Sequence, residues 1–177
     1  DPKKIEKLKL ELGRLKSMNI YFSGQIENPG INLVHPFSDI FSAIIQAGGI
    51  TSDCSLREIQ LIRKGIIIDK VDFYSFFMDG KNNFSNIKLI DGDVIHIPTI
   101  QKRISISGGV IRPSSYELLG SDTFTDLLKY ASGTTSNASS NIIINQIIPI
   151  EERTSDDNAI TSIATNFKEI ESIILNN

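Results

Sequence analysis

An internal repeat with a constant spacing of 84 residues is the feature that most constrains the fold of this chain. Residues 20–29 align with residues 104–113, and residues 38–49 align with residues 122–133 at the same spacing and without a gap. Few residues are identical, but the order of apolar, glycine and proline positions is the same. A repeat of this length within 177 residues predicts two similar small domains in tandem.

The best-matched segment of each copy predicts an amphipathic helix. Apolar residues occur at i, i+3, i+4 and i+7, which places them on one face. They are Ile40, Ala43, Ile44 and Ala47 in the first copy and Phe124, Leu127, Leu128 and Ala131 in the second. Each helix is therefore expected to bury one face.

Both ends of each helix carry termination signals. Ser38 and Asp122 are predicted N-caps, because their side-chain oxygens can accept hydrogen bonds from the first free backbone N–H groups. Gly48-Gly49 and Gly133 follow the helices, where a left-handed residue is favoured. Ser132 replaces the first of these glycines in the second copy, and we expect that exchange to cost little.

The segments around each helix predict strands. A β-hairpin precedes each helix, with a glycine and a proline at matching places, and its second strand is expected at Ile31 to Val34 or Tyr116 to Leu119. The matching pairs are Gly24 and Pro29 in the first copy and Gly108 and Pro113 in the second.

The first copy continues with a second hairpin. Its strands, 59–63 and 66–69, are joined by Lys64-Gly65; a short helix at 72–80 ends at Gly80. The turn Asp91-Gly92-Asp93 then leads into a strand closed by Pro98. The second copy offers a strand at 142–148 and a helical or extended piece at 167–175.

This order predicts an α+β protein with two tandem β-grasp (ubiquitin-like) domains, each a mixed sheet with one long helix across a face. The expected boundaries are 1–17 for an N-terminal helix or linker, 18–99 for the first domain and 103–177 for the second. In the N-terminal helix, Ile5, Leu8, Leu12 and Leu15 share one face. The closing turn and strand of the second copy are expected beyond Asn177, so we interpret that domain as truncated.

The charge distribution argues against a nucleic-acid partner. Residues 1–17 hold six of the 18 Lys/Arg and three of the 21 Asp/Glu, which leaves 12 against 18 and a net charge of −6 on residues 18–177. Nucleic-acid binding requires a cationic surface that neutralises phosphates.

The residues that could carry catalysis or bind metal are few, and we expect neither an enzyme nor a cofactor. Cys54 is the single cysteine, interpreted as a half-exposed small residue, and His35 and His96 lack partners at zinc-ligand spacing. His96 is expected to face outward from its strand. Asp91 and Asp93 are interpreted as turn residues whose carboxylates accept backbone N–H groups around Gly92.

Saccharides are bound by aromatic faces together with planar polar groups. On this basis Tyr21, Arg112, Tyr116 and Tyr130 are the candidate saccharide contacts of the chain. The alternative for each of them is an ordinary residue on the surface of a strand or helix.

Several segments, in order and in both copies, resemble the soluble-ligand-binding β-grasp (SLBB) domains of polysaccharide and capsule export proteins. They are Gly24 to Gly30, Gln46 to Gly49, Ser55 to Gly65, Leu89 to Pro98 and Arg112 to Leu118. The resemblance covers about residues 18–150.

The resemblance implies a periplasmic, outer-membrane-associated export assembly of Gram-negative bacteria. Polysaccharide would be the ligand, the protein would form a ring-shaped homo-oligomer, and inner-membrane export machinery is a further implied partner. A second hypothesis is a small-ligand or DNA-uptake receptor, because similar β-grasp domains occur in such proteins. A third, a subunit of a redox enzyme, needs cofactor ligands; one cysteine excludes an iron–sulfur cluster within these residues.

Overall fold

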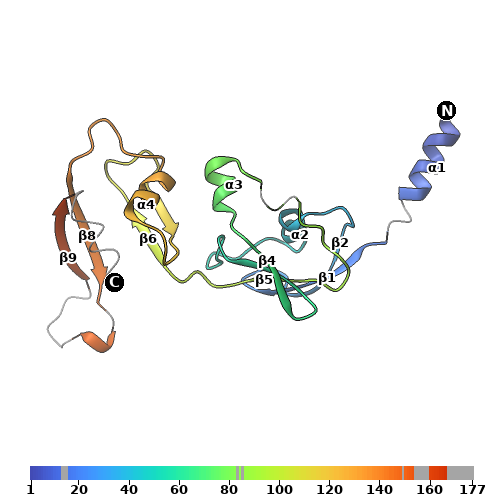
Figure 1. Cartoon of the computed structure of the whole chain (residues 1–177), viewed down its shortest axis with the longest axis horizontal. Coiled ribbons are helices and arrows are strands. Elements are labelled where there is room, and N and C mark those ends of the chain that lie inside the picture. Colours follow the sequence, from blue (N-terminus) through green and yellow to red (C-terminus); the bar gives the residue numbers. More distant parts are fainter. Residues whose placement is uncertain (13–15, 83, 85, 149, 154–159, 167–177) are drawn as a thin grey trace. The chain divides into compact units, whose positions relative to one another are not determined.

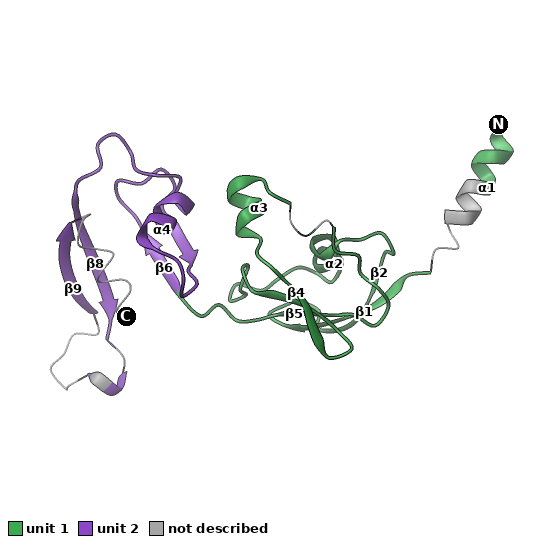
Figure 2. Cartoon of the chain, viewed as in Figure 1, with its two compact units in different colours: residues 1–102 green, residues 103–177 purple. Residues whose placement is uncertain are grey.

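A computed structural model divides the chain into two compact units, unit 1 (residues 1–102) and unit 2 (residues 103–177), shown in Figure 2. The structure describes residues 1–12, 16–82, 84, 86–148, 150–153 and 160–166. The elements of unit 1 are α1 (Pro2–Leu12), β1 (Met18–Gly24), β2 (Gly30–Val34), α2 (Ile40–Gln46), β3 (Ile59–Arg63), β4 (Ile66–Val71), α3 (Tyr74–Asp79) and β5 (Val94–Ile97). Leu15 of the expected N-terminal helix lies outside the described residues.

Unit 1 is built on a five-stranded mixed sheet with the order β2-β1-β5-β3-β4. β1 and β5 pair in parallel, and the other neighbours are antiparallel. Figure 1 shows α2 on one side of this sheet. A mixed sheet with a helix on one face is the β-grasp arrangement, so the predicted α+β class is confirmed.

The core of unit 1 lies between the sheet and α2. Along β1, Ile20 and Phe22 point to the helix side and are buried, whereas Tyr21 points to the opposite side. This alternation follows from the two-residue period of a strand. The helix contributes the predicted stripe, of which Ile40, Ala43, Ile44 and Ala47 are all buried.

The predicted N-caps are wrong by one residue in both copies. Asp39 caps α2 and accepts a hydrogen bond from the Ser42 backbone N–H at 2.8 Å. Thr123 caps α4 and forms a capping box with Asp126. Ser38 and Asp122 precede these caps, and adjacent residues able to cap cannot be ranked from their type alone.

Unit 2 contains β6 (Arg103–Ile106), β7 (Ser114–Glu117), α4 (Phe124–Tyr130), β8 (Asn141–Ile147), the 3-10 helix η1 (Ile150–Glu152) and β9 (Ile160–Asn166). β7 begins two residues earlier than predicted. β6 pairs with β7 and β8 pairs with β9 in two separate antiparallel sheets, so the mixed sheet predicted for the second copy is not found among the described residues of unit 2. β9 was not predicted, because its polar and apolar residues alternate weakly, yet it pairs along its whole length with β8. The predicted piece at 167–175 lies outside the described residues.

Each unit contains the same backbone hydrogen bond at positions 84 residues apart, so the repeat is also present in the three-dimensional structure. Glu27 N–H donates to the Gly49 carbonyl at 2.9 Å, and Ile111 N–H donates to the Gly133 carbonyl at 3.0 Å. Isolated β-bridges join Ile26 to Ile50 and Val110 to Thr134 at equivalent places.

Glycine is required where the backbone turns after the first strand of each copy. Gly24 and Gly108 share φ +86°, a left-handed value that side chains disfavour. At Gly24 an added Cβ would also overlap the backbone carbonyl oxygen of Ile97, whereas nothing described lies within 4 Å at Gly108. The glycines at matching places in the two copies therefore serve the same backbone turn.

Two sequence interpretations need correction. Ser132 adopts a left-handed conformation with φ 62° at the place of Gly48 (φ 92°), so the exchange costs more than expected. Cys54 is buried rather than half exposed and belongs to the core of unit 1, because its segment forms a bridge to Thr99.

Candidate functional site

The structure does not bring the four candidate saccharide contacts together. Tyr21 lies on β1 of unit 1 and is 43% exposed, and Arg112 is exposed in the turn before β7 of unit 2. Tyr116 and Tyr130 are 6% and 8% exposed. Tyr21 is thus the candidate whose aromatic ring is available to a ligand.

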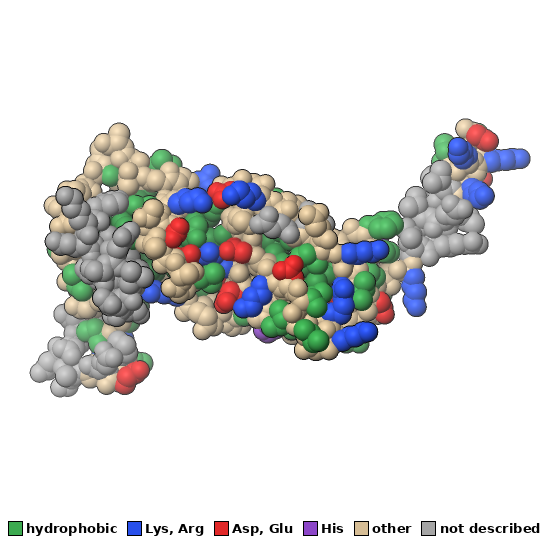
Figure 3. Space-filling view, viewed as in Figure 1, with side chains coloured by type: hydrophobic (Ala, Val, Ile, Leu, Met, Phe, Trp, Pro, Cys, Tyr) green, Lys and Arg blue, Asp and Glu red, His purple; other side chains and the backbone are tan. Residues whose placement is uncertain are grey.

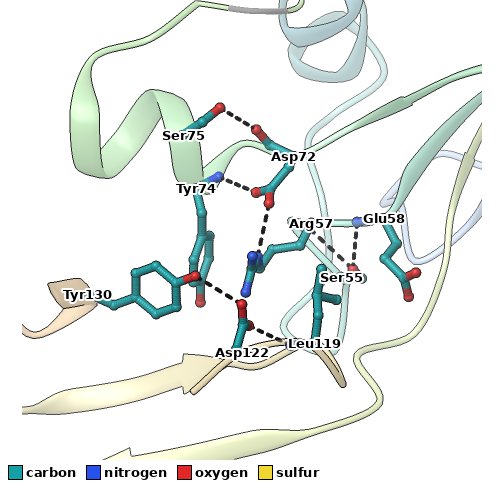
Figure 4. Close-up of polar contacts among 9 residues, drawn as sticks. All are labelled: Ser55, Arg57, Glu58, Asp72, Tyr74, Ser75, Leu119, Asp122 and Tyr130. Atoms are coloured by element: carbon teal, nitrogen blue, oxygen red, sulfur yellow. Dashed lines mark hydrogen bonds and ion pairs between the residues drawn. The ribbon is translucent and has the colours of Figure 1, made fainter. Parts of the chain in front are cut away.

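The two buried tyrosines hold the hairpin and helix of unit 2. The Tyr116 hydroxyl donates to the Arg112 carbonyl at 2.8 Å. The Tyr130 hydroxyl donates to the Asp122 carboxylate at 3.3 Å, as Figure 4 shows. Their ring centroids lie 6.4 Å apart. Both side chains are buried, so the surface position expected as their alternative is wrong, and these contacts favour a structural role for both residues.

Tyr21 belongs to an apolar row that crosses the whole sheet of unit 1 on the side opposite α2. The strand registers place five side chains directly beside one another in the order Ile31, Tyr21, Val94, Ile62 and Ile67. Ile31, Tyr21 and Ile67 are 60%, 43% and 49% exposed, and the two central residues are half-buried. We call this set the apolar row.

A second set of side chains, the polar row, runs beside the apolar row on the same face. It consists of Ser23, His96, Gln60 and Lys70, again in direct register. Ser23 Oγ and His96 Nδ1 lie 2.9 Å apart and share a hydrogen bond. That bond fixes the imidazole ring and directs the other ring nitrogen away from Ser23, and the predicted outward orientation of His96 is confirmed.

The equivalent sheet positions of unit 2 are polar. At the 84-residue spacing Ser105 replaces Tyr21 and Ser115 replaces Ile31. The two serines are cross-strand partners, as Tyr21 and Ile31 are, and their Oγ atoms lie 2.6 Å apart. The fold therefore accepts small polar residues at these two positions, and the apolar row is a property of unit 1.

The Asp-Gly-Asp turn positions β5 in the middle of this sheet. Asp91 Oδ1 accepts hydrogen bonds from the backbone N–H and the side-chain amide of Asn19, at 2.8 and 3.0 Å. These bonds hold the pKa of Asp91 below its ordinary value. Gly92 has φ 86°, so the predicted turn interpretation is confirmed.

Asp93 makes an ion pair that sequence reasoning missed. Its fully buried carboxylate accepts two hydrogen bonds from Arg63, from Nε at 2.7 Å and from Nη2 at 2.8 Å, and one from Ile90 N–H at 2.9 Å. The hydrogen bonds to Asp93 raise the pKa of Arg63. The pair links β3 to the turn before β5, and so supports both rows.

A second polar cluster of unit 1 surrounds Asp72 (Figure 4). Its carboxylate accepts hydrogen bonds from Arg57 Nε at 3.1 Å and from Tyr74 N–H at 2.7 Å. The Arg57 guanidinium also lies 5.0 Å from the centroid of the Tyr74 ring. Because these groups satisfy one another, the cluster is suited to fixing the start of α3.

The described residues offer little for other kinds of site. Within them, no three His, Cys, Asp or Glu side chains are arranged to hold a metal ion. None of the described helices combines the length and apolar character needed to cross a bilayer. Figure 3 shows Lys/Arg and Asp/Glu side chains interspersed over the side of unit 1 in view.

Of the residues in the two rows, sequence reasoning finds Tyr21 as a candidate and His96 as an outward-facing residue. It identifies Ile31, Val94, Ile62 and Ile67 only as strand residues. A strand with apolar residues on both faces, such as β1 with Ile20, Tyr21 and Phe22, is the signal that could have indicated a second apolar surface.

The fold and the repeat define a protein with two tandem α+β units, of which the first is a β-grasp with an open, partly apolar sheet face. Comparison with known proteins agrees with this class. The profile of the family described as "SLBB domain" matches residues 19–69 and 103–155, which is more than half of the chain. The chain belongs to the SLBB domain family.

Similarity also extends to a curated transport protein. Two Escherichia coli proteins, both named "Polysialic acid transport protein KpsD", are 27% identical to this chain over 116 residues. The match covers 64% of this chain and 20% of the length of each relative. The likeness is therefore to one part of a much longer protein.

Proposed function

We propose that this chain is the periplasmic portion of an outer-membrane protein that exports a capsular polysaccharide or exopolysaccharide. Its two SLBB units act as structural modules of an oligomeric translocon, and unit 1 contacts the saccharide. The observation that carries the proposal is the SLBB match in both copies of the repeat, within a chain similar to a polysialic acid transport protein.

A non-enzymatic role is part of this proposal. Two ion pairs of unit 1, Arg63 with the buried Asp93 and the buried Arg57 with Asp72, hold the turn before β5 and the start of α3. These pairs thus support a scaffold that presents a surface.

Genetic deletion in the organism that encodes the chain tests the export function. Removal of residues 18–102 in frame is expected to abolish polysaccharide at the cell surface and to cause its accumulation inside the cell. A plasmid copy of the intact gene is the control and should restore export. Normal surface polysaccharide after the deletion would show that the proposed function is wrong.

The oligomeric part of the proposal needs a separate measurement. Native mass spectrometry of the whole protein, extracted in a membrane mimetic, should show a closed oligomer, because repeated contacts between copies build symmetric rings. Only monomer under these conditions would overturn the translocon role, whatever the result of the deletion.

A further inference from the structure

The apolar row of unit 1 is an exposed surface that the fold does not require. Core formation explains the inward residues of β1, but Tyr21 and Ile31 lie on the other face and are 43% and 60% exposed. Unit 2 uses the hydrogen-bonded Ser105 and Ser115 at the equivalent positions. An exposed apolar pair that the equivalent positions of the second copy replace with serine indicates a binding surface.

The shape of the two rows matches a long and narrow ligand. Adjacent strands lie about 4.8 Å apart, so a row that crosses five strands is roughly 19 Å long. Two residues along a strand advance by roughly 7 Å, which separates the apolar row from the polar row. The surface is therefore an amphipathic strip that is longer than it is wide.

A polysaccharide has the matching chemistry. Each sugar ring presents an apolar face of C–H groups and a rim of hydroxyl groups, and the linked rings extend this pattern along the chain. The ring of Tyr21 and its aliphatic neighbours suit the C–H faces. His96, Gln60 and Lys70 can exchange hydrogen bonds with hydroxyl or carboxylate groups at the rim.

We propose that the uncovered sheet face of unit 1 is a saccharide-binding strip, on which a glycan chain lies across the strands with its C–H faces on the apolar row. The inference rests on the proposed export function, for which the polysaccharide is the cargo. Tyr21 provides the aromatic contact, and His96, oriented by Ser23, provides a hydrogen-bonding group beside it.

The test uses a double variant that copies the serine pair of unit 2, Tyr21→Ser with Ile31→Ser. Because the same pair already occurs at the equivalent positions of unit 2, the variant should keep the fold, and circular dichroism checks this. The matched control is Ile45→Ser, since Ile45 on α2 is 59% exposed and lies outside both rows.

Binding is measured by calorimetry and by NMR titration of the chain. The probes are the polysaccharide purified from the organism that encodes the chain and oligosialic acid. We expect at least one probe to shift the amides of β1, β5 and β3. The double variant should weaken this binding about tenfold, equivalent to about 1.4 kcal/mol of lost contact, and the control should not.

Three results would overturn the proposal. One is the absence of binding by either probe, the second is binding that the double variant leaves unchanged, and the third is self-association of the glycan-free chain that the double variant abolishes. The third would assign the face to a second copy of the chain. Each leaves the export function standing if the in-frame deletion abolishes surface polysaccharide.

Discussion

Alanine at Gly24 and at Gly108 gives a matched pair of variants that isolates one backbone contact. The two glycines have the same φ of +86°, so alanine meets the same left-handed penalty of about 1–2 kcal/mol at both. Only at Gly24 does the added Cβ overlap the Ile97 carbonyl oxygen, with the carbonyl carbon 2.8 Å away. The difference in destabilisation between the two variants therefore measures the cost of placing a Cβ against the Ile97 carbonyl of β5.

The magnitude at Gly24 follows from what the Cβ must displace. The Ile97 carbonyl accepts a hydrogen bond from Gln25 N–H at 2.8 Å, at the end of the parallel β1–β5 ladder. Loss of that bond adds about 1 kcal/mol. We expect Gly24→Ala to destabilise unit 1 by about 2–3 kcal/mol, and Gly108→Ala to destabilise unit 2 by about 1–2 kcal/mol.

Hydrogen exchange read by mass spectrometry suits this comparison, because peptides from each unit report its opening free energy separately. The expected result is a large loss of protection in β1 and β5 for Gly24→Ala and a smaller loss in β6 for Gly108→Ala. Equal losses in the two units would refute the role of the Ile97 carbonyl. Unchanged protection in Gly24→Ala would show that this turn does not require glycine.

Further predictions concern caps and charges. Ser132→Gly should stabilise unit 2 by about 1 kcal/mol, because it removes a side chain from a left-handed backbone position. Gly48→Ser should destabilise unit 1 by more than about 1 kcal/mol, because the new side chain also overlaps the side chain of Asn28. Urea denaturation measures both changes. The pKa of Asp91 is lowered in the folded protein, so its stabilising effect is present above the ordinary aspartate pKa of about 3.9 and is lost as the pH falls through the folded pKa. Asp91→Asn should therefore make the free energy of unfolding of unit 1 depend less on pH in the acid range. Arg63→Met should cost about 3 kcal/mol, because it leaves the Asp93 carboxylate buried without its partner, whereas Lys81→Met, at an exposed pair, should cost about 0.5 kcal/mol or less in the same assay.

The parts of the fold that could be predicted from the sequence depend on short-range signals. The helix stripe at Ile40 and Ile44, the tight turn at Lys64-Gly65 and the positive φ of Gly92 each depend on a few neighbouring residues, and the structure confirms them. A cap shifted by one residue, from Ser38 to Asp39, shows the limit, since both side chains can accept the same hydrogen bond.

The candidate site depends on contacts between distant residues, which local patterns do not specify. Tyr21 meets Val94 only because β1 and β5 pair in parallel across 73 residues of sequence, from 21 to 94. The exposure of Tyr21 and the burial of Tyr116 follow from which sheet face each side chain occupies, and a tyrosine is common on both kinds of face.

Comparison of equivalent residues in the two units separates residues that the fold requires from residues that the fold leaves free. Where both copies keep a residue type, as at Gly24 and Gly108, the backbone requires it. Where the copies differ at a left-handed backbone position, as at Gly48 and Ser132, the difference affects stability. At Tyr21 and Ser105 the residue types differ, but strand, register and partner position are unchanged. No folding requirement explains that difference, so it ranks Tyr21 and the apolar row above Arg112 as the place to look for a ligand.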